Sequence, residues 1–130
     1  MAKVMKIKWL QEPAEKDYEA AASYLSLVAD EATVKKIVAN LRKAPMSGAK
    51  AKDIMRASRL PLLPPSDVLV ARDMAKARAG KPLSPVLLVR GDAARGLPLQ
   101  IADGYHRVCA NYHFGDDSEI PCHVVGLEGK

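Results

Sequence analysis

The stretch from residue 85 to residue 125 reads PVLLVRGDAARGLPLQIADGYHRVCANYHFGDDSEIPCHVV. Its apolar residues form three short segments and one segment with helical spacing, at residues 85–90, 97–102, 120–125 and 105–114. A short apolar run is typical of a buried strand, whereas apolar residues three and four positions apart indicate one face of a helix. We therefore predict strand, strand, helix and strand in this order, with turns at 91–96 and 115–118.

The first 59 residues are predicted to be mainly helical. Residues 4–10 near the start alternate weakly between apolar and polar side chains, which predicts a strand. The apolar spacing predicts three helices, at about 17–29, 30–41 and 51–58. Asp30 is a suitable N-cap for the second helix, and Pro45 and Gly48 predict a break before the third. Each helix has one apolar and one charged face, so each is expected to pack against another part of the fold.

Residues 60–67, LPLLPPSD, contain three prolines, which excludes a helix interior and a central strand. We predict an ordered segment that crosses from the helical part to the mixed part. Ser66 is the expected N-cap of a fourth helix that runs to about Arg78, and Gly80 suits its C-terminal stop. The sequence thus predicts one α+β domain over residues 1–130, with a helical part at 1–59 and a core with a small mixed sheet at 60–130.

The composition is that of an ordinary globular protein, with 48% hydrophobic and 27% charged residues. This excludes a disordered tail and a collagen-like fibre. No apolar stretch is long enough for a bilayer span or a signal peptide, so no membrane partner is expected. Two cysteines are too few for a disulfide scaffold, and we expect a cytoplasmic protein with free thiols.

The turn Asp103-Gly104-Tyr105-His106-Arg107 carries the clearest chemical signal. Gly104 permits a sharp backbone turn, and a helix that starts there presents free N–H groups and the positive end of its dipole. Such a helix start is a ready anion site. Cations in the first turn are unfavourable unless an anion lies beside them, so His106 and Arg107 favour a bound phosphate. The alternative is an arginine paired with a surface carboxylate and a histidine at the rim.

Residues 60–126 resemble the sulfiredoxin/ParB-like nucleotide-binding fold. The resemblance rests on the proline-led strand, the hairpin, the strand–Gly-x-His-Arg–helix turn and the pair Ile120-Pro121 that opens the last strand. It implies that Gly104, Tyr105, His106 and Arg107 hold the phosphates of a nucleotide such as ATP or CTP. It also implies that the helix at 66–78 contributes contacts to the nucleotide.

The chain departs from both branches of this family. Tyr105 stands where sulfiredoxins have their catalytic cysteine, which makes sulfinic acid repair by that route unexpected. No helix-turn-helix follows, so centromere binding of the ParB type is not expected either. His106 remains a candidate proton carrier, and Asp103 a candidate Mg²⁺ ligand or base. The alternative for Asp103 is a turn-former and helix N-cap. The expected function is binding of a nucleotide or a phosphorylated small molecule, with phosphoryl transfer or nucleotide hydrolysis left open.

A zinc site is a rival interpretation of the same region. All histidines and cysteines fall between residues 106 and 123: His106, Cys109, His113, Cys122 and His123. The first three share a helix face, but Cys122 and His123 are adjacent in a strand and should point to opposite faces. The spacing matches no standard zinc motif, so no metal site is predicted. The expected alternative has Cys109 and Cys122 buried and His113 and His123 at the surface.

The net charge of +5 has a local origin. Residues 32–65 contain eight lysines and arginines against Asp53 alone. Such a block predicts either a nucleic-acid partner, bound by Lys35, Lys36, Lys50 and Lys52, or a solvated helical face. A small basic nucleic-acid-binding or regulatory protein is therefore the alternative function. A protein-interaction module that kept the fold without its chemistry is the third.

Overall fold

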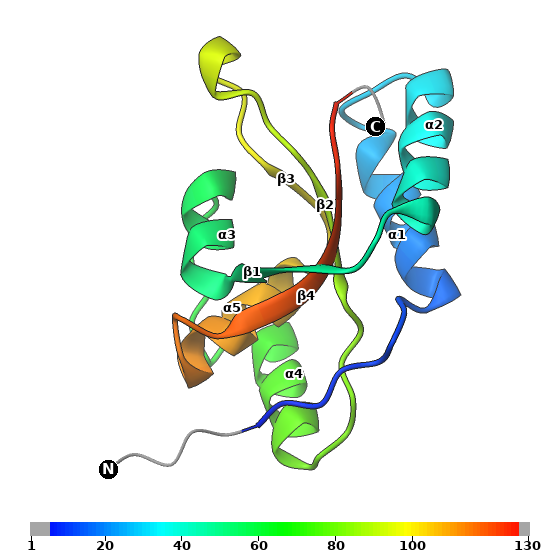
Figure 1. Ribbon diagram of the computed structural model, residues 1–130. Coiled ribbons are helices and arrows are strands. Elements are labelled where there is room, and N and C mark those ends of the chain that lie inside the picture. The colour runs from blue at the N-terminus through cyan, green and yellow to red at the C-terminus, as the bar shows by residue number, and fades with distance from the viewer. Residues whose placement is uncertain (1–5, 128–130) are drawn as a thin grey trace.

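One mixed sheet lies between two helical layers in the computed structural model, which describes residues 6–127 (Figure 1). The elements are α1 (Glu15–Leu25), α2 (Glu31–Lys43), β1 (Ser47–Lys50), α3 (Ala51–Ser58), α4 (Val68–Arg78), β2 (Val86–Val89), the short 3₁₀ helix η1 (Ala93–Arg95), β3 (Gln100–Asp103), α5 (Tyr105–Phe114) and β4 (Glu119–Val125). The expected α+β class and the helical character of the N-terminal part are confirmed.

The strands of the sheet follow the order β1-β4-β2-β3. β2 pairs parallel with β4 and antiparallel with β3, while β4 pairs antiparallel with β1 at the opposite edge. A parallel pair needs a crossover connection, and the chain from β2 to β4 runs through β3 and α5. The start of α5 therefore directly follows the edge strand β3.

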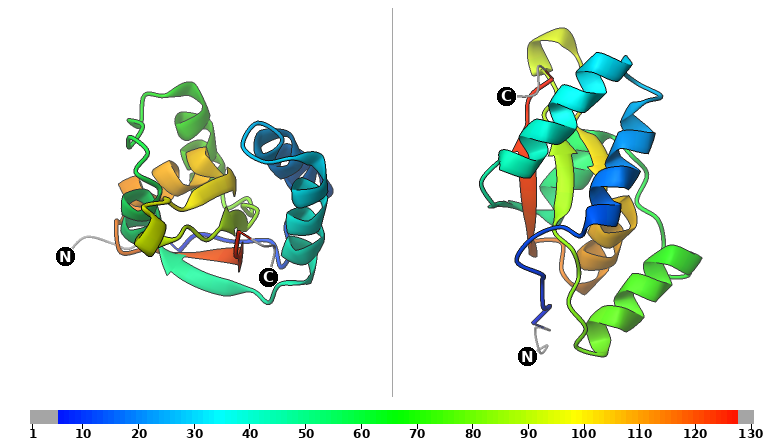
Figure 2. Two further views of the ribbon diagram at one scale, coloured as in Figure 1. Left: turned by 90° about the horizontal axis from the view of Figure 1, so that it is seen from above. Right: turned by 90° about the vertical axis from the view of Figure 1, so that its right-hand side faces the viewer.

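The two faces of β2 contact different helical layers because successive side chains of a strand point to opposite sides. Leu87 and Val89 pack with α1 and α2, whereas Val86 and Leu88 pack with α3, α4 and α5 (Figure 2). All four side chains are at most 2% exposed, which confirms the predicted buried strand. None of the helices between residues 6 and 127 combines the length and apolar character that a bilayer span requires.

The N-cap of α2 is the residue predicted from the sequence, but the N-cap of α4 is not. The Asp30 carboxylate accepts from the Thr33 N–H at 2.8 Å and caps α2, as predicted. The N-cap of α4 is Asp67 rather than Ser66, because the Asp67 carboxylate accepts from the N–H groups of Leu69 and Val70. α1 ends at Leu25, four residues before the predicted end.

The N-terminal part differs from the prediction in its strands. Residues 6–10 contain only an isolated bridge between Trp9 and Leu83 instead of a strand, and residues 4–5 lie outside the described residues. β1 lies where Pro45 and Gly48 predicted a break, and it pairs with residues 119–122. The helical part therefore supplies an edge strand to the sheet of the C-terminal part.

Candidate functional site

The turn between β3 and α5 has a backbone shape that requires glycine. Gly104 has φ +111°, a value that L-residues with side chains rarely adopt. A Cβ atom at this position would lie 2.4 Å from Val86 Cγ1 and 2.8 Å from Val86 Cβ. Val86 is fully buried in the central strand, so it cannot move aside. The absence of a side chain at Gly104 thus lets the helix start close against the sheet.

The first turn of α5 has free backbone donors. No side chain among residues 6–127 caps the helix, and its first backbone bond to the turn runs from the Val108 N–H to the Gly104 carbonyl at 2.9 Å. The N–H groups that precede Val108 have no acceptor within the helix. Together with the helix dipole, these amides of residues 105–107 favour a negatively charged ligand.

A pocket of about 350 Å³ opens beside this helix start. It lies between α1 and the β3–α5 turn, and its lining is Ala20, Tyr24, Leu60, Ile101, Ala102, Asp103, Gly104, Tyr105 and His106. We call it the turn pocket. Its volume is in the range of small-molecule sites. Four of the five predicted site residues of the turn therefore line one pocket, and Arg107 does not.

The aromatic side chains of the turn pocket are held in place. The Tyr24 hydroxyl donates to the Gln100 side-chain carbonyl, and the Tyr105 hydroxyl donates to the Pro61 carbonyl of the crossing segment. The His106 ring lies 5.4 Å from the Tyr105 ring, at an interplanar angle of 41°. The pocket thus combines two fixed aromatic walls with a histidine next to the free amides.

Arg107 points into an ion cluster, which we call the Arg107 cluster and which comprises Arg107, Asp17 and Asp103. The guanidinium donates to Asp103 at 2.8 Å and lies 3.9 Å from the Asp17 carboxylate. The three side chains are 16%, 6% and 14% exposed for Arg107, Asp17 and Asp103. Asp17 and Asp103 thus supply the negative charge that is expected beside a cation in the first helical turn. The charge of Arg107 therefore does not by itself require a phosphate.

Burial raises the pKa of two carboxyl groups, that of Asp103 in this cluster and that of Asp73 beside it. It raises the pKa of Asp103, against the opposing effect of Arg107, and the neighbouring Asp17 carboxylate raises this pKa further. Burial also raises the pKa of Asp73 in α4, where the positive charges of Arg107, Arg72 and His106 oppose it. Negative charge is therefore disfavoured at both carboxyl groups. The Oδ2 atom of Asp103 is already engaged by Arg107, so a Mg²⁺ ion or a proton bound at that atom would compete with this bond.

The histidines and cysteines do not assemble into a metal site within residues 6–127. Cys109 and Cys122 are buried free thiols, and burial raises the pKa of each. Cys122 and His123 point to opposite faces of β4, as predicted: Cys122 packs with α3 and α5, while His123 donates from Nδ1 to the Ala44 carbonyl at 2.8 Å. His113 is hydrogen bonded to the Leu63 carbonyl. The expected surface position of His123 is wrong, because its side chain is buried under the segment that contains Ala44.

The four lysines proposed for nucleic acid do not form one surface. Lys35 and Lys36 lie on α2, whereas Lys50 ends the edge strand β1 and Lys52 lies in α3, which covers the other face of the sheet (Figure 1). Three of them form ion pairs: Lys35 with Glu31 at 3.2 Å, and Lys50 and Lys52 with Asp117 at 3.8 and 2.6 Å. The basic block of the sequence is therefore divided between α2 and the β1–α3 junction, and its charge is partly neutralised.

Sequence reasoning did not place Asp17, Tyr24 and Asp73 near the turn. Each lies on α1 or α4, at least 30 residues before Gly104 in the chain. Asp17 did carry a local signal, since its carboxylate accepts from the Ala14 N–H at 2.9 Å at the start of α1. That signal predicts a helix start and says nothing of Arg107. The packing of α1 against β3 brings Asp17 and Tyr24 to the site, and the packing of α4 against α5 brings Asp73 there.

No protein-family model, curated protein or solved structure matches the chain. The resemblance to the sulfiredoxin/ParB-like fold therefore rests on the residues of the turn and its flanking strands alone.

Proposed function

We propose that the chain binds a nucleotide or another phosphate ester at the start of α5. The phosphate would accept hydrogen bonds from the free amides of residues 105–107, and the organic part would occupy the turn pocket. The observation that carries this proposal is the uncapped start of a ten-residue helix that opens into a pocket. Such a helix start has both the donors and the dipole for an anion.

The side chains of the pocket support a ligand with a phosphate and a flat ring. Tyr24 and Tyr105 present aromatic surface, and their hydroxyl groups are already bonded to the protein. His106 stands in the first helical turn, where it can donate to a phosphate oxygen or transfer a proton. ATP and CTP both have the required chemistry, with or without Mg²⁺.

Arg107 supports the site from outside the pocket. Its bond to Asp103 joins the end of β3 to the first turn of α5, and its contact with Asp17 joins this turn to α1. Phosphoryl transfer or hydrolysis would need His106 as proton carrier and Asp103 as metal ligand or base.

Both free cysteines are buried thiols, which agrees with the proposed cytoplasmic location.

A thermal-shift screen with ATP, ADP and CTP, with and without Mg²⁺, tests the proposal. A ligand at one hundred times its Kd stabilises the fold by about 2.7 kcal/mol, or about 10 °C in a chain of this size. His106→Glu should abolish the shift, because its carboxylate repels phosphate while it favours the helix start. His106→Gln is the matched neutral control and should retain part of the shift. No shift with any of these nucleotides would overturn the proposal.

A further inference from the structure

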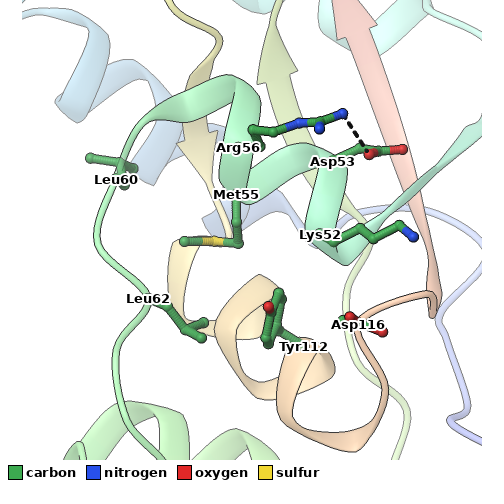
Figure 3. Close-up of a pocket in the computed structure, with 8 residues that line it drawn as sticks. All are labelled: Lys52, Asp53, Met55, Arg56, Leu60, Leu62, Tyr112 and Asp116. Carbon is green, nitrogen blue, oxygen red and sulfur yellow. Dashed lines mark ion pairs between the residues drawn. The ribbon is translucent and has the colours of Figure 1, made fainter.

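A pocket of about 690 Å³ opens between α3, the crossing segment and the end of α5 (Figure 3). Both of its cations already have carboxylate partners. The Lys52 ammonium lies 2.6 Å from Asp117. The Arg56 guanidinium lies 3.6 Å from Asp53, as the dashed line in Figure 3 marks. The protein thus neutralises the cations of this pocket itself.

A smaller pocket, of about 380 Å³, lies where the segment before α1, the end of α2 and β4 meet. Its lining is Gln11, Glu12, Pro13, Glu15, Tyr18, Arg42, Ala44, Met46 and His123. We call it the His123 pocket. It has no lining residue in common with the turn pocket. Its volume is in the range of small-molecule sites, and most of its lining residues are polar.

His123 brings a buried polar atom without a partner to this pocket. The residue is 6% exposed, and its ring donates from Nδ1 to the Ala44 carbonyl at 2.8 Å. Because a carbonyl only accepts hydrogen bonds, the proton of the neutral ring is on Nδ1 and Nε2 has a free lone pair. No group of residues 6–127 donates to Nε2. A buried acceptor without a donor is costly, and in native proteins such an atom is usually bonded to water or to a ligand.

The Tyr18 ring forms a fixed wall of the His123 pocket. The Arg42 guanidinium lies 4.3 Å from the centroid of this ring, and it also makes two hydrogen bonds to the Glu15 carboxylate. Burial raises the pKa of Tyr18; Arg42 opposes this rise, whereas the negative charge of Glu12 adds to it. The Glu12 carboxylate therefore acts on the same wall of the pocket.

The charges of the His123 pocket favour a cation. Arg42 and Glu15 neutralise each other, which leaves the Glu12 carboxylate without an ion pair among the residues from 6 to 127. α2 also ends at this pocket, since Arg42 is in its last turn and Ala44 is its C-cap. The C-terminal end of a helix carries partial negative charge, which attracts cations. An anion would be repelled by both features.

We propose that the His123 pocket binds a small primary alkylamine in its ammonium form. One N–H of the ammonium group would donate to His123 Nε2, and Glu12 would supply the opposite charge. Nε2 is closed to bulk water, so a side chain of the lining must shift to admit the ligand. Met46 is suited to this, because it is 40% exposed and its unbranched side chain has three rotatable bonds. The proposal is independent of phosphate binding in the turn pocket.

Titration of the full chain with n-butylamine at pH 8, where an alkylamine carries its proton, tests this proposal. Long-range ¹H–¹⁵N NMR of the histidine rings reports directly on His123 Nε2, because the signal of a nitrogen with a free lone pair moves when it accepts a hydrogen bond. We expect this signal to move saturably. The ring signals of His106 and His113, which lie outside the pocket, should stay unchanged.

Two analogues separate the hydrogen bond from the charge. Butyltrimethylammonium keeps the charge and the alkyl chain but has no N–H, and 1-butanol keeps a donor but has no charge. Each should bind about tenfold more weakly than n-butylamine, as expected for the loss of one charge-assisted hydrogen bond. Equal binding of butyltrimethylammonium would overturn the proposal, because Nε2 would then play no part. A Nε2 signal that does not move with n-butylamine would also overturn it and would leave an ordered water as the only occupant.

Variants test the two protein groups, with the amide signals of Tyr18 and Met46 as the readout. His123→Asn keeps a donor for the Ala44 carbonyl but removes the acceptor at Nε2, and should weaken n-butylamine binding by about tenfold. Glu12→Gln should weaken it by about fivefold. Glu19→Gln is the matched control, because Glu19 is an exposed glutamate of α1 outside the pocket. Equal affinities of the Glu12 and Glu19 variants would overturn the proposal. The analogues keep the test valid even if His123→Asn fails to fold.

Discussion

Substitution of Gly104 by alanine tests whether the β3–α5 turn needs the shape described above. The new Cβ would lie 2.4 Å from Val86 Cγ1, well inside contact distance, and Val86 is fully buried. Overpacking of this kind costs about 1–3 kcal/mol. The left-handed backbone at φ +111° costs an L-residue about 1–2 kcal/mol more. We expect Gly104→Ala to lower the free energy of unfolding by about 3 kcal/mol.

Gly96→Ala is the matched control for this substitution. Gly96 also has a positive φ, of +71°, but a Cβ atom added there would have no neighbour within 4 Å. Only the backbone cost remains, so the expected loss is about 1 kcal/mol. Urea denaturation measures both values, and the midpoint of Gly104→Ala should fall about 1 M below that of Gly96→Ala. Equal losses for the two variants would refute the claim that Gly104 is required for close packing.

Three further substitutions test the surroundings of the turn. Arg107→Ala leaves the two carboxylates of the Arg107 cluster without their partner. It should lower the free energy of unfolding, measured by urea denaturation, by about 3 kcal/mol. A loss below about 1 kcal/mol would show that Arg107 does not stabilise these carboxylates. Asp73→Asn should stabilise the fold at pH 7 but not below pH 4. A carboxyl group whose pKa is raised in the folded state contributes its full stability below its ordinary pKa near 3.8 and loses this contribution as the pH rises through the raised pKa. Urea denaturation at both pH values tests this, and an equal effect at the two pH values or a loss of stability at pH 7 would contradict it. Tyr105→Phe removes the hydrogen bond to the Pro61 carbonyl and should cost about 1 kcal/mol, whereas an unchanged melting temperature would show that the crossing segment does not depend on it.

The sequence predicted the C-terminal elements well because their signals are local. The apolar run at residues 86–89 forms the buried central strand, and the helical spacing after Gly104 forms α5. β1 escaped prediction because Ser47–Lys50 has no apolar alternation, and an edge strand is defined by its partner β4 rather than by its own residues. The cap of α4 was misplaced by one residue because Ser66 and Asp67 are both good N-cap residues.

The candidate site was predictable only in its local part. Gly104 and His106 were found because a glycine at a strand–helix junction has a direct structural meaning. The surroundings of Arg107 depend on Asp17, which lies 90 residues earlier and reaches the turn only through the packing of α1 on the sheet. The same packing brings Tyr24 to the turn pocket. Contacts of this range leave no pattern in the local sequence.

Phosphate contact with the first turn of α5 is tested most directly by ¹H–¹⁵N NMR during titration with ATP and CTP. Phosphate oxygens that accept from backbone N–H groups should shift the amide signals of Tyr105, His106 and Arg107 first and most strongly. The signal of Gly96, in the distant hairpin, should remain unchanged. Saturable shifts centred on residues 105–107 are the predicted result. Unchanged signals at these three amides, with either nucleotide and with or without Mg²⁺, would contradict phosphate binding at this site.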